Sequence, residues 1–155
     1  DGQLYLCGLS VWQSNAGKEG AFHRVRYNGK PVHMPCDLHV VPSGVELSFT
    51  SPLEEKSAID PENYGIEQWI YKWTSNYGSP EFSVKNPDEK VHDTVELKSV
   101  KLSSDRKTVL LEIPDLKPVM QMKIKYHVTA ADGTSLNQEV FNTIHRVPAS
   151  IASKH

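Results

Sequence analysis

The chain has few cysteines, no long apolar run and no block of charge of one sign. Its 155 residues include only 2 Cys, at positions 7 and 36. They lie too far apart in sequence for the Cys-x-x-Cys-His motif of a c-type haem, and they are too few for a four-cysteine zinc site. The apolar runs are a few residues long, whereas a membrane helix needs about 20 residues. The 17 Lys and Arg nearly balance the 19 Asp and Glu. We therefore expect no cofactor, no membrane span and no nucleic-acid partner for this chain.

The two cysteines, Cys7 and Cys36, leave two interpretations open. They form one disulfide, or both remain buried thiols, and an even number does not decide between these. The first residues, Asp1-Gly2-Gln3, lack the charged and apolar regions of a signal peptide, and a strand pattern follows almost at once. We therefore expect the chain to be a piece of a longer protein.

Strand patterns dominate the chain. β-branched and aromatic residues recur at every second position, in segments separated by Gly, Pro, Asn and Asp. The pattern predicts strands at 3–9, 21–27, 45–49, 66–74, 94–101, 108–113, 121–129 and 139–146. Helix is scarce, and the best candidate is one turn within residues 57–64, where Asp60 is a suitable cap and Pro61 suits the first helical position. The predicted fold class is all-β.

A change of composition indicates a boundary between two units. Residues 28–44 contain three prolines and two glycines, and proline cannot donate a hydrogen bond to a β-sheet. The predicted organisation is a terminal pair of strands at 1–30, a linker at 31–43, a β-sandwich at 44–148 with a long loop at 75–92, and a tail at 149–155.

Several motifs after Gly44 resemble the bacterial Ig-like module of S-layer and cell-envelope proteins. These motifs are a strand ending in Phe49, the element "DPENY" at 60–64, the hairpin "SSDRKTVLLEIPDLKP" at 103–118, and the turn Asp132-Gly133. The resemblance covers about 100 residues. It implies that the sandwich is Ig-like.

A second resemblance covers nearly the whole chain. The segments "DGQLYLCGLSVWQ", "GAFHRVRYNGKPVHMP", "YKWTSNYGSPEFSV", "DLKPVMQMKIKYHV" and "FNTIHR" are similar to the C-terminal region of large secreted proteins of planctomycetes and verrucomicrobia, identified as membrane-bound or sorbosone-type sugar dehydrogenases. In that family a six-bladed β-propeller precedes this region. The resemblance implies that residues 1–30 are the last propeller strands and that the protein is periplasmic or extracellular.

Residues 33–39 raise the question of a metal site, because they hold two histidines, a methionine and a cysteine. His33, Met34, Cys36 and His39 offer the ligand types of a blue-copper centre. In cupredoxins, however, the methionine follows the cysteine and the histidine, whereas Met34 precedes them. The favoured interpretation is a linker with ordinary packing, and a copper electron-transfer domain is an alternative.

Catalytic constellations are weakly supported. Cys36 and His39 lie close in sequence, but neighbours on an extended segment diverge, and no Gly-x-Ser-x-Gly motif is present. Glycoside hydrolysis requires two carboxylates about 5–10 Å apart. The acidic residues in the central part of the chain are interpreted as solubilising charge in turns and on strand surfaces: Glu54, Glu55, Asp60, Glu62, Glu67 and Glu81. We therefore expect no catalytic residues in this chain.

Aromatic residues are the most distinctive feature of the sequence. Trp69, Tyr71 and Trp73 alternate along one predicted strand, and Tyr77 and Phe82 lie in the loop that follows. Such a row is either covered by the loop or by a neighbouring domain, which we favour, or is a platform for carbohydrate.

These observations predict a non-catalytic accessory module. We expect an Ig-like β-sandwich, preceded by a β-hairpin that resembles the end of a propeller, that packs on a neighbouring domain or subunit of a secreted redox protein or an envelope assembly. Trp12 joins the five aromatic residues named above as an expected contact.

Overall fold

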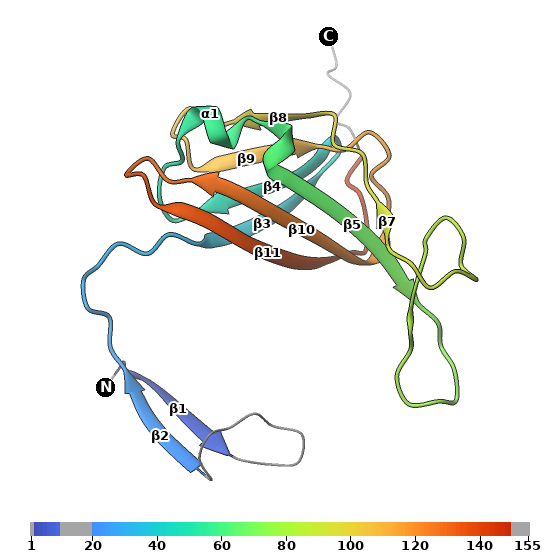
Figure 1. Ribbon diagram of the computed structural model, residues 1–155, viewed down its shortest axis with the longest axis horizontal. Coiled ribbons are helices and arrows are strands. Elements are labelled where there is room, and N and C mark those ends of the chain that lie inside the picture. Colours follow the sequence, from blue (N-terminus) through green and yellow to red (C-terminus); the bar gives the residue numbers. More distant parts are fainter. Residues whose placement is uncertain (1, 10–19, 150–155) are drawn as a thin grey trace. The chain divides into compact units, whose positions relative to one another are not determined.

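A computed structural model of the chain describes residues 2–9 and 20–149 (Figure 1). The fold is mostly β, with 50% of the residues in strands and 5% in helices. All pairs of strands are antiparallel, which confirms the all-β prediction. The chain divides into two compact units, Asp1–Pro31 and Val32–His155.

The first unit is a two-stranded sheet. Strand β1 (Leu4–Leu9) pairs with β2 (Gly20–Val25), with Leu4 opposite Val25 and Gly8 opposite Ala21. Trp12 lies in the segment that joins these strands and is outside the described residues.

The second unit contains two sheets that face each other (Figure 1). One sheet has the order β3 (Pro35–Val41), β4 (Gly44–Phe49), β9 (Thr108–Glu112) and β8 (Ser99–Leu102). The other has the order β11 (Ser135–Ile144), β10 (Val119–Thr129), β5 (Tyr64–Tyr71) and β6 (Glu81–Phe82), and β7 (Asp93–Thr94) also pairs with β5. The arrangement is a β-sandwich.

The core lies between the two sheets and follows the alternation of the sequence. Val109 and Leu111 of β9 and Ile124 of β10 are fully buried, as the period of two predicts. Phe49 meets Tyr126 edge to face, with 5.4 Å between the ring centroids. Alternate residues of these strands therefore face the core, as expected for strands with one buried side.

Two short helical segments precede β5. In α1 (Glu55–Ala58) the Glu54 side chain accepts hydrogen bonds from two backbone N–H groups of the first turn. In the 3₁₀ turn η1 (Pro61–Asn63) Asp60 is the cap and Pro61 occupies the first position, as predicted. The helix α1 was not predicted from the sequence.

The prediction of a linker at 31–43 is wrong for most of that segment. Residues 35–41 form β3, which pairs with β4. Pro35 is tolerated because it is the first residue of a strand at the sheet edge, where its missing N–H removes little from the ladder. Leu38 and Val40 pack against the core, so the side chains of this strand alternate between the core and the outer face despite the nearby prolines.

Other boundaries also differ from the predictions. The strand expected at 139–146 is β11, Ser135–Ile144, and the strand expected at 21–27 is β2, Gly20–Val25. The strand expected at 66–74 ends at Tyr71, and the strand expected at 94–101 is two separate strands, β7 and β8. The loop expected at 75–92 contains the short strand β6. Only residue 149 of the expected tail lies within the described part of the chain.

Candidate functional site

The β1–β2 hairpin carries apolar side chains on both faces. The register places Leu4, Leu6 and Val25 on one face, and Tyr5 and Phe22 on the other. All five are exposed, Phe22 at 71%, and Tyr5 and Phe22 stack with 5.5 Å between their ring centroids. A sheet with one wet face alternates polar and apolar residues, whereas strands buried on both faces do not. Each face also holds one polar side chain, His23 opposite Leu6 and Arg24 opposite Tyr5, so both faces are mostly apolar.

The face of β5 that points away from the core contains a compact aromatic and ionic cluster. Trp69 is only 3% exposed, because the imidazole of His92 stacks on its indole at 4.0 Å between ring centroids, with 9° between the planes. The ring of Phe141 on β11 approaches the indole edge-on at 6.4 Å. The Nε1–H of Trp69 donates to the Tyr71 hydroxyl at 2.9 Å. The loop residue His92 therefore covers Trp69.

Two carboxylates hold this imidazole from opposite sides. His92 Nδ1 lies 3.2 Å from Glu67 Oε2, and His92 Nε2 lies 2.5 Å from Glu81 Oε2. The hydrogen bond from Lys123 at 2.7 Å, together with that of His92, lowers the pKa of Glu67. Partial burial favours neutral imidazole, but the hydrogen bonds to Glu81 and Glu67 outweigh it and raise the pKa of His92 above its usual 6.5. The cluster therefore joins the loop to the sheet most strongly when His92 is charged.

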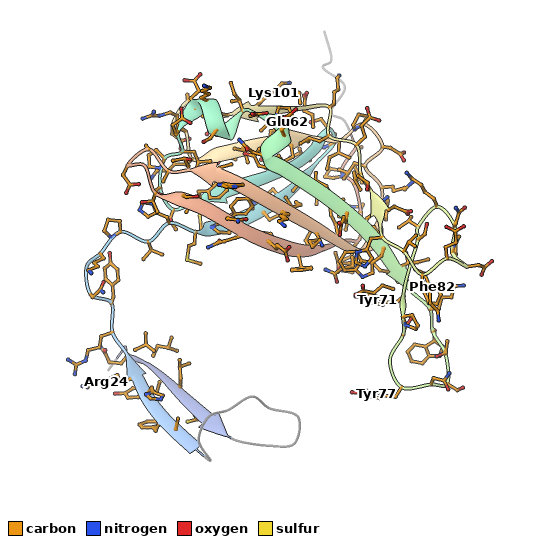
Figure 2. The ribbon with its side chains drawn as sticks, in the orientation of Figure 1. Arg24, Glu62, Tyr71, Tyr77, Phe82 and Lys101 are labelled. Carbon is orange, nitrogen blue, oxygen red and sulfur yellow. The ribbon has the colours of Figure 1, made fainter. Side chains whose placement is uncertain are left out.

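The aromatic row predicted from spacing is not a three-ring surface. Trp69 is covered, Tyr71 is partly exposed, and Trp73 lies beyond the end of β5, where it is fully exposed. Phe82 lies at the base of the loop after β5, and the fully exposed Tyr77 lies at its tip (Figure 2). The expectation of one strand face failed because the strand ends at Tyr71.

A buried carboxylate shapes the second half of the loop. Asp93 accepts hydrogen bonds from Ser83 Oγ and from the backbone N–H of Val84, both at 2.7 Å, and from the backbone N–H of Lys85 at 3.0 Å. Burial opposes the charged form, but these hydrogen bonds outweigh it and hold the pKa of Asp93 below its usual range. This arrangement is structural, because the described contacts use both carboxylate oxygens.

The side chains proposed as copper ligands have other partners. His33 is placed between Ser51, at 2.7 Å from Nδ1, and Asp132, at 3.0 Å from Nε2. His39 Nε2 lies 2.9 Å from Asp37, and Cys36 is exposed with its thiol 3.5 Å from the carbonyl of Ser48. Met34 is also exposed. Within residues 2–9 and 20–149, no three His, Cys, Asp or Glu side chains form a group that could hold a metal ion.

The cysteines and the remaining acidic residues are also placed. Cys7 and Cys36 are exposed free thiols, so the expectation of burial is wrong, and neither forms a disulfide in this structure. Glu54 and Asp60 cap helical turns. Glu55 and Glu62 are exposed residues in the first turns of those helical segments. Glu67 and Glu81 are the acidic pair that the fold brings together, through His92.

An apolar hollow of about 600 Å³ lies beside the aromatic cluster, at the end of β5. Its lining includes Tyr71, Pro118 and Met120.

The helices in the described part of the chain are too short to span a membrane.

Comparison of the chain with protein-family models, with curated proteins and with solved structures gives no match. The resemblances drawn from sequence motifs therefore remain predictions.

The role of His92 does not follow from any pattern in the sequence. The alternation along β5 already indicates that Glu67 and Trp69 share a face. His92, which covers Trp69, lies 23 residues later on a loop. No local sequence pattern predicts such a contact. Similarly, the sequence predicts the hairpin as a pair of strands. The exposure of its apolar side chains depends on packing with other parts of a protein, which a strand pattern does not encode.

Proposed function

We propose that the chain is a non-catalytic docking module, an Ig-like sandwich that carries a hairpin for insertion into a neighbouring β-sheet domain or subunit. The motif resemblance to sugar dehydrogenase-like proteins supports a propeller as that neighbour. In this proposal the assembly is secreted or belongs to the cell envelope, and any redox chemistry occurs outside this chain.

The observation that carries the proposal is the exposure of the hairpin on both faces. Covering one large apolar side chain stabilises a protein by about 1.5–3 kcal/mol. The hairpin leaves Leu4, Leu6 and Phe22 among the exposed large hydrophobic residues. A partner that covered both faces would gain several kcal/mol of association free energy.

The strand edges favour a partner that is itself a sheet. Within the described residues, β1 pairs only with β2, so this sheet has two strands and both of them are edge strands. An isolated two-stranded hairpin is marginally stable in water. Addition to the edge of another sheet would provide further backbone hydrogen bonds and stabilise the hairpin.

The polar groups of the sandwich support a structural role. Glu54 and Asp60 are used as caps, Asp93 as a loop anchor, and His92 as a bridge between carboxylates. Each of these groups stabilises the conformation of a particular segment of the sandwich.

Photo-crosslinking in the producing cells tests the proposal. We would place p-benzoylphenylalanine at the position of Phe22 and, as a matched control, at the position of Ile59, which is exposed on the sandwich. The expected result is one cross-linked polypeptide at position 22, mapped to an edge strand of a β-sheet, and no such product at position 59.

The double variant Leu4→Asp, Leu6→Asp provides a second arm, because it removes the apolar face without touching the cross-linking position. We expect it to abolish the cross-link from position 22. An unchanged cross-link, or the same products from positions 22 and 59, would contradict docking through the hairpin.

A further inference from the structure

The loop between β5 and β6 has a firmly held base. Ile70 pairs with Phe82 and Tyr71 with Glu81. The backbone N–H of Lys72 donates to Ser79 Oγ at 2.9 Å, which closes the loop across its neck. The base is therefore a defined platform for the residues beyond it.

The side chain of Lys72 adds two contacts at the same place. Its Nζ lies 2.9 Å from the Asp88 carboxylate and 4.5 Å from the centroid of the Phe82 ring. Although these exposed contacts are individually weak, they connect the loop base to the neighbouring turn. The cation of Lys72 is thus directed to the base and away from the tip.

Residues 73–78, which lie between the neck residues Lys72 and Ser79, form the tip of this loop and present two aromatic rings that make no contribution to the core. Trp73 and Tyr77 are fully exposed, and Figure 2 shows Tyr77 at the far end of the loop, well beyond Tyr71 and Phe82. Leaving a large apolar side chain in water forgoes about 1.5–3 kcal/mol of stabilisation for each ring. Two such rings on one nine-residue loop, 72–80, indicate a surface for a ligand.

The other residues of the tip define the chemistry of that ligand. Residues 73–80 contain no charged side chain, and Thr74, Ser75 and Asn76 between the rings offer hydroxyl and amide groups. Aromatic faces pack against apolar C–H surfaces, while hydroxyl and amide groups hydrogen-bond with neutral polar groups. A sugar ring presents both: C–H bonds on its faces and hydroxyl groups around its rim.

We propose that the loop at residues 72–80 binds a neutral polysaccharide, with Trp73 and Tyr77 stacking on sugar rings. This site differs from the row predicted by spacing, because Trp69 is covered by His92 and Tyr77 takes part. The absence of cationic side chains from the tip disfavours an anionic lipid surface, which attracts Lys and Arg. The site contains no residue of the hairpin, so the proposal of polysaccharide binding can be tested independently of the proposal of docking.

Affinity electrophoresis in native gels tests the proposal with four neutral probes: hydroxyethylcellulose, xylan, galactomannan and laminarin. We expect at least one to retard the intact chain, and Trp73→Ala and Tyr77→Ala each to weaken the apparent dissociation constant by about tenfold or more. Because both side chains are fully exposed, both variants are expected to keep the unfolding midpoint of the unmodified chain.

Phe141→Ala is the matched control, since it removes a ring that is 55% exposed on β11 and outside the loop. We expect its retardation to equal that of the unmodified chain. Absence of retardation with all four probes would overturn the proposal, as would equal loss in Phe141→Ala. Binding to vesicles of phosphatidylcholine and phosphatidylglycerol that Trp73→Ala abolishes, without polysaccharide binding, would assign the loop to lipid instead.

Discussion

Asp93 shows how one side chain organises a loop. Its carboxylate is buried and accepts three hydrogen bonds from Ser83, Val84 and Lys85. Since the backbone of the following residue, Thr94, pairs with Glu67 of β5, these contacts connect the loop directly to the sheet. Asp93 therefore determines the conformation of a segment with little regular structure.

Asp93→Ala is expected to destabilise the protein by about 2–3 kcal/mol, because it leaves three donors without their acceptor. The measurement is urea unfolding, combined with hydrogen exchange at the amides of Val84 and Lys85, which should become faster. Asp88→Ala is the control, since Asp88 is exposed and its carboxylate contacts the exposed cation of Lys72. A loss of stability as large for Asp88→Ala would contradict this account.

His92 gives the fold a pH dependence of predictable sign. Its pKa is raised in the folded chain, so the stabilisation that it provides is fully present below its ordinary pKa of about 6.5 and is lost as the pH rises through the raised value. Glu67, whose pKa is lowered in part by Lys123, acts in the opposite sense and loses its contribution as the pH falls below about 4.5.

The His92→Gln variant is therefore expected to be less stable than the unmodified chain at pH 6, with a difference that shrinks toward pH 9. Urea unfolding across this range measures the difference, and an NMR titration of the His92 ring should report a pKa above 6.5. The groups that face the ring are Glu67, Glu81 and, through Glu67, Lys123. A difference that grows with pH would contradict the bridging geometry.

At the scale of residues, the sequence predicts local features, such as a helix cap or the buried side of a strand, better than contacts between distant residues. The cap at Asp60 and the buried sides of β9 and β10 follow from spacing alone. The stacking of His92 on Trp69 and the anchoring by Asp93 depend on a loop that returns across the sheet. The path of a loop that folds back over a sheet depends on tertiary packing, which the local periodicity of the sequence does not encode.

At the scale of elements, β4 and β9 approach each other closely at Gly44. Gly44 begins β4 opposite Glu112, and a Cβ atom built on Gly44 would lie 1.9 Å from the backbone oxygen of Leu111. A carbon atom cannot occupy that position unless the strands separate. Glycine at position 44 is thus required by packing between backbones.

Gly44→Ala is expected to cost about 1–3 kcal/mol or more, as overpacked cores do, measured as the change in free energy of unfolding. Gly65→Ala is the matched control on β5, because a Cβ there would meet nothing within 4 Å. Equal stability of the two variants would contradict the register of β4 and β9.

The strands that the sequence predicted correctly are those with uninterrupted alternation, such as β9 and β10. Strand β3 was missed because Pro35 and Pro42 flank it and outweighed the alternation of Leu38 and Val40. Strand β5 was predicted too long because Trp73 continues the aromatic spacing after the pairing with β10 has ended at Trp69. In both cases hydrogen bonding to neighbouring strands decided the boundary.

For the whole molecule, the two units differ in how they are stabilised. The sandwich has a closed core of fully buried residues such as Val45, Leu111 and Ile124, whereas the apolar residues of the hairpin are exposed. A core of this kind supports independent folding. An isolated two-stranded hairpin is only marginally stable in water.

Removal of residues 1–31 is therefore expected to leave the thermal midpoint of the sandwich within about 2 °C of that of the full chain. Differential scanning calorimetry measures both midpoints under the same conditions. A large decrease after truncation would show that the hairpin contributes to the folding of the sandwich.

Hydrogen exchange in the hairpin is the most direct test of docking. In the isolated chain, the amides of residues 4–9 and 20–25 should exchange rapidly, while those of β9 remain protected. In the native assembly purified from the producing cells, the hairpin amides should become protected to a degree comparable with β9. Slow exchange of the hairpin in the isolated chain, or fast exchange in the assembly, would contradict the account.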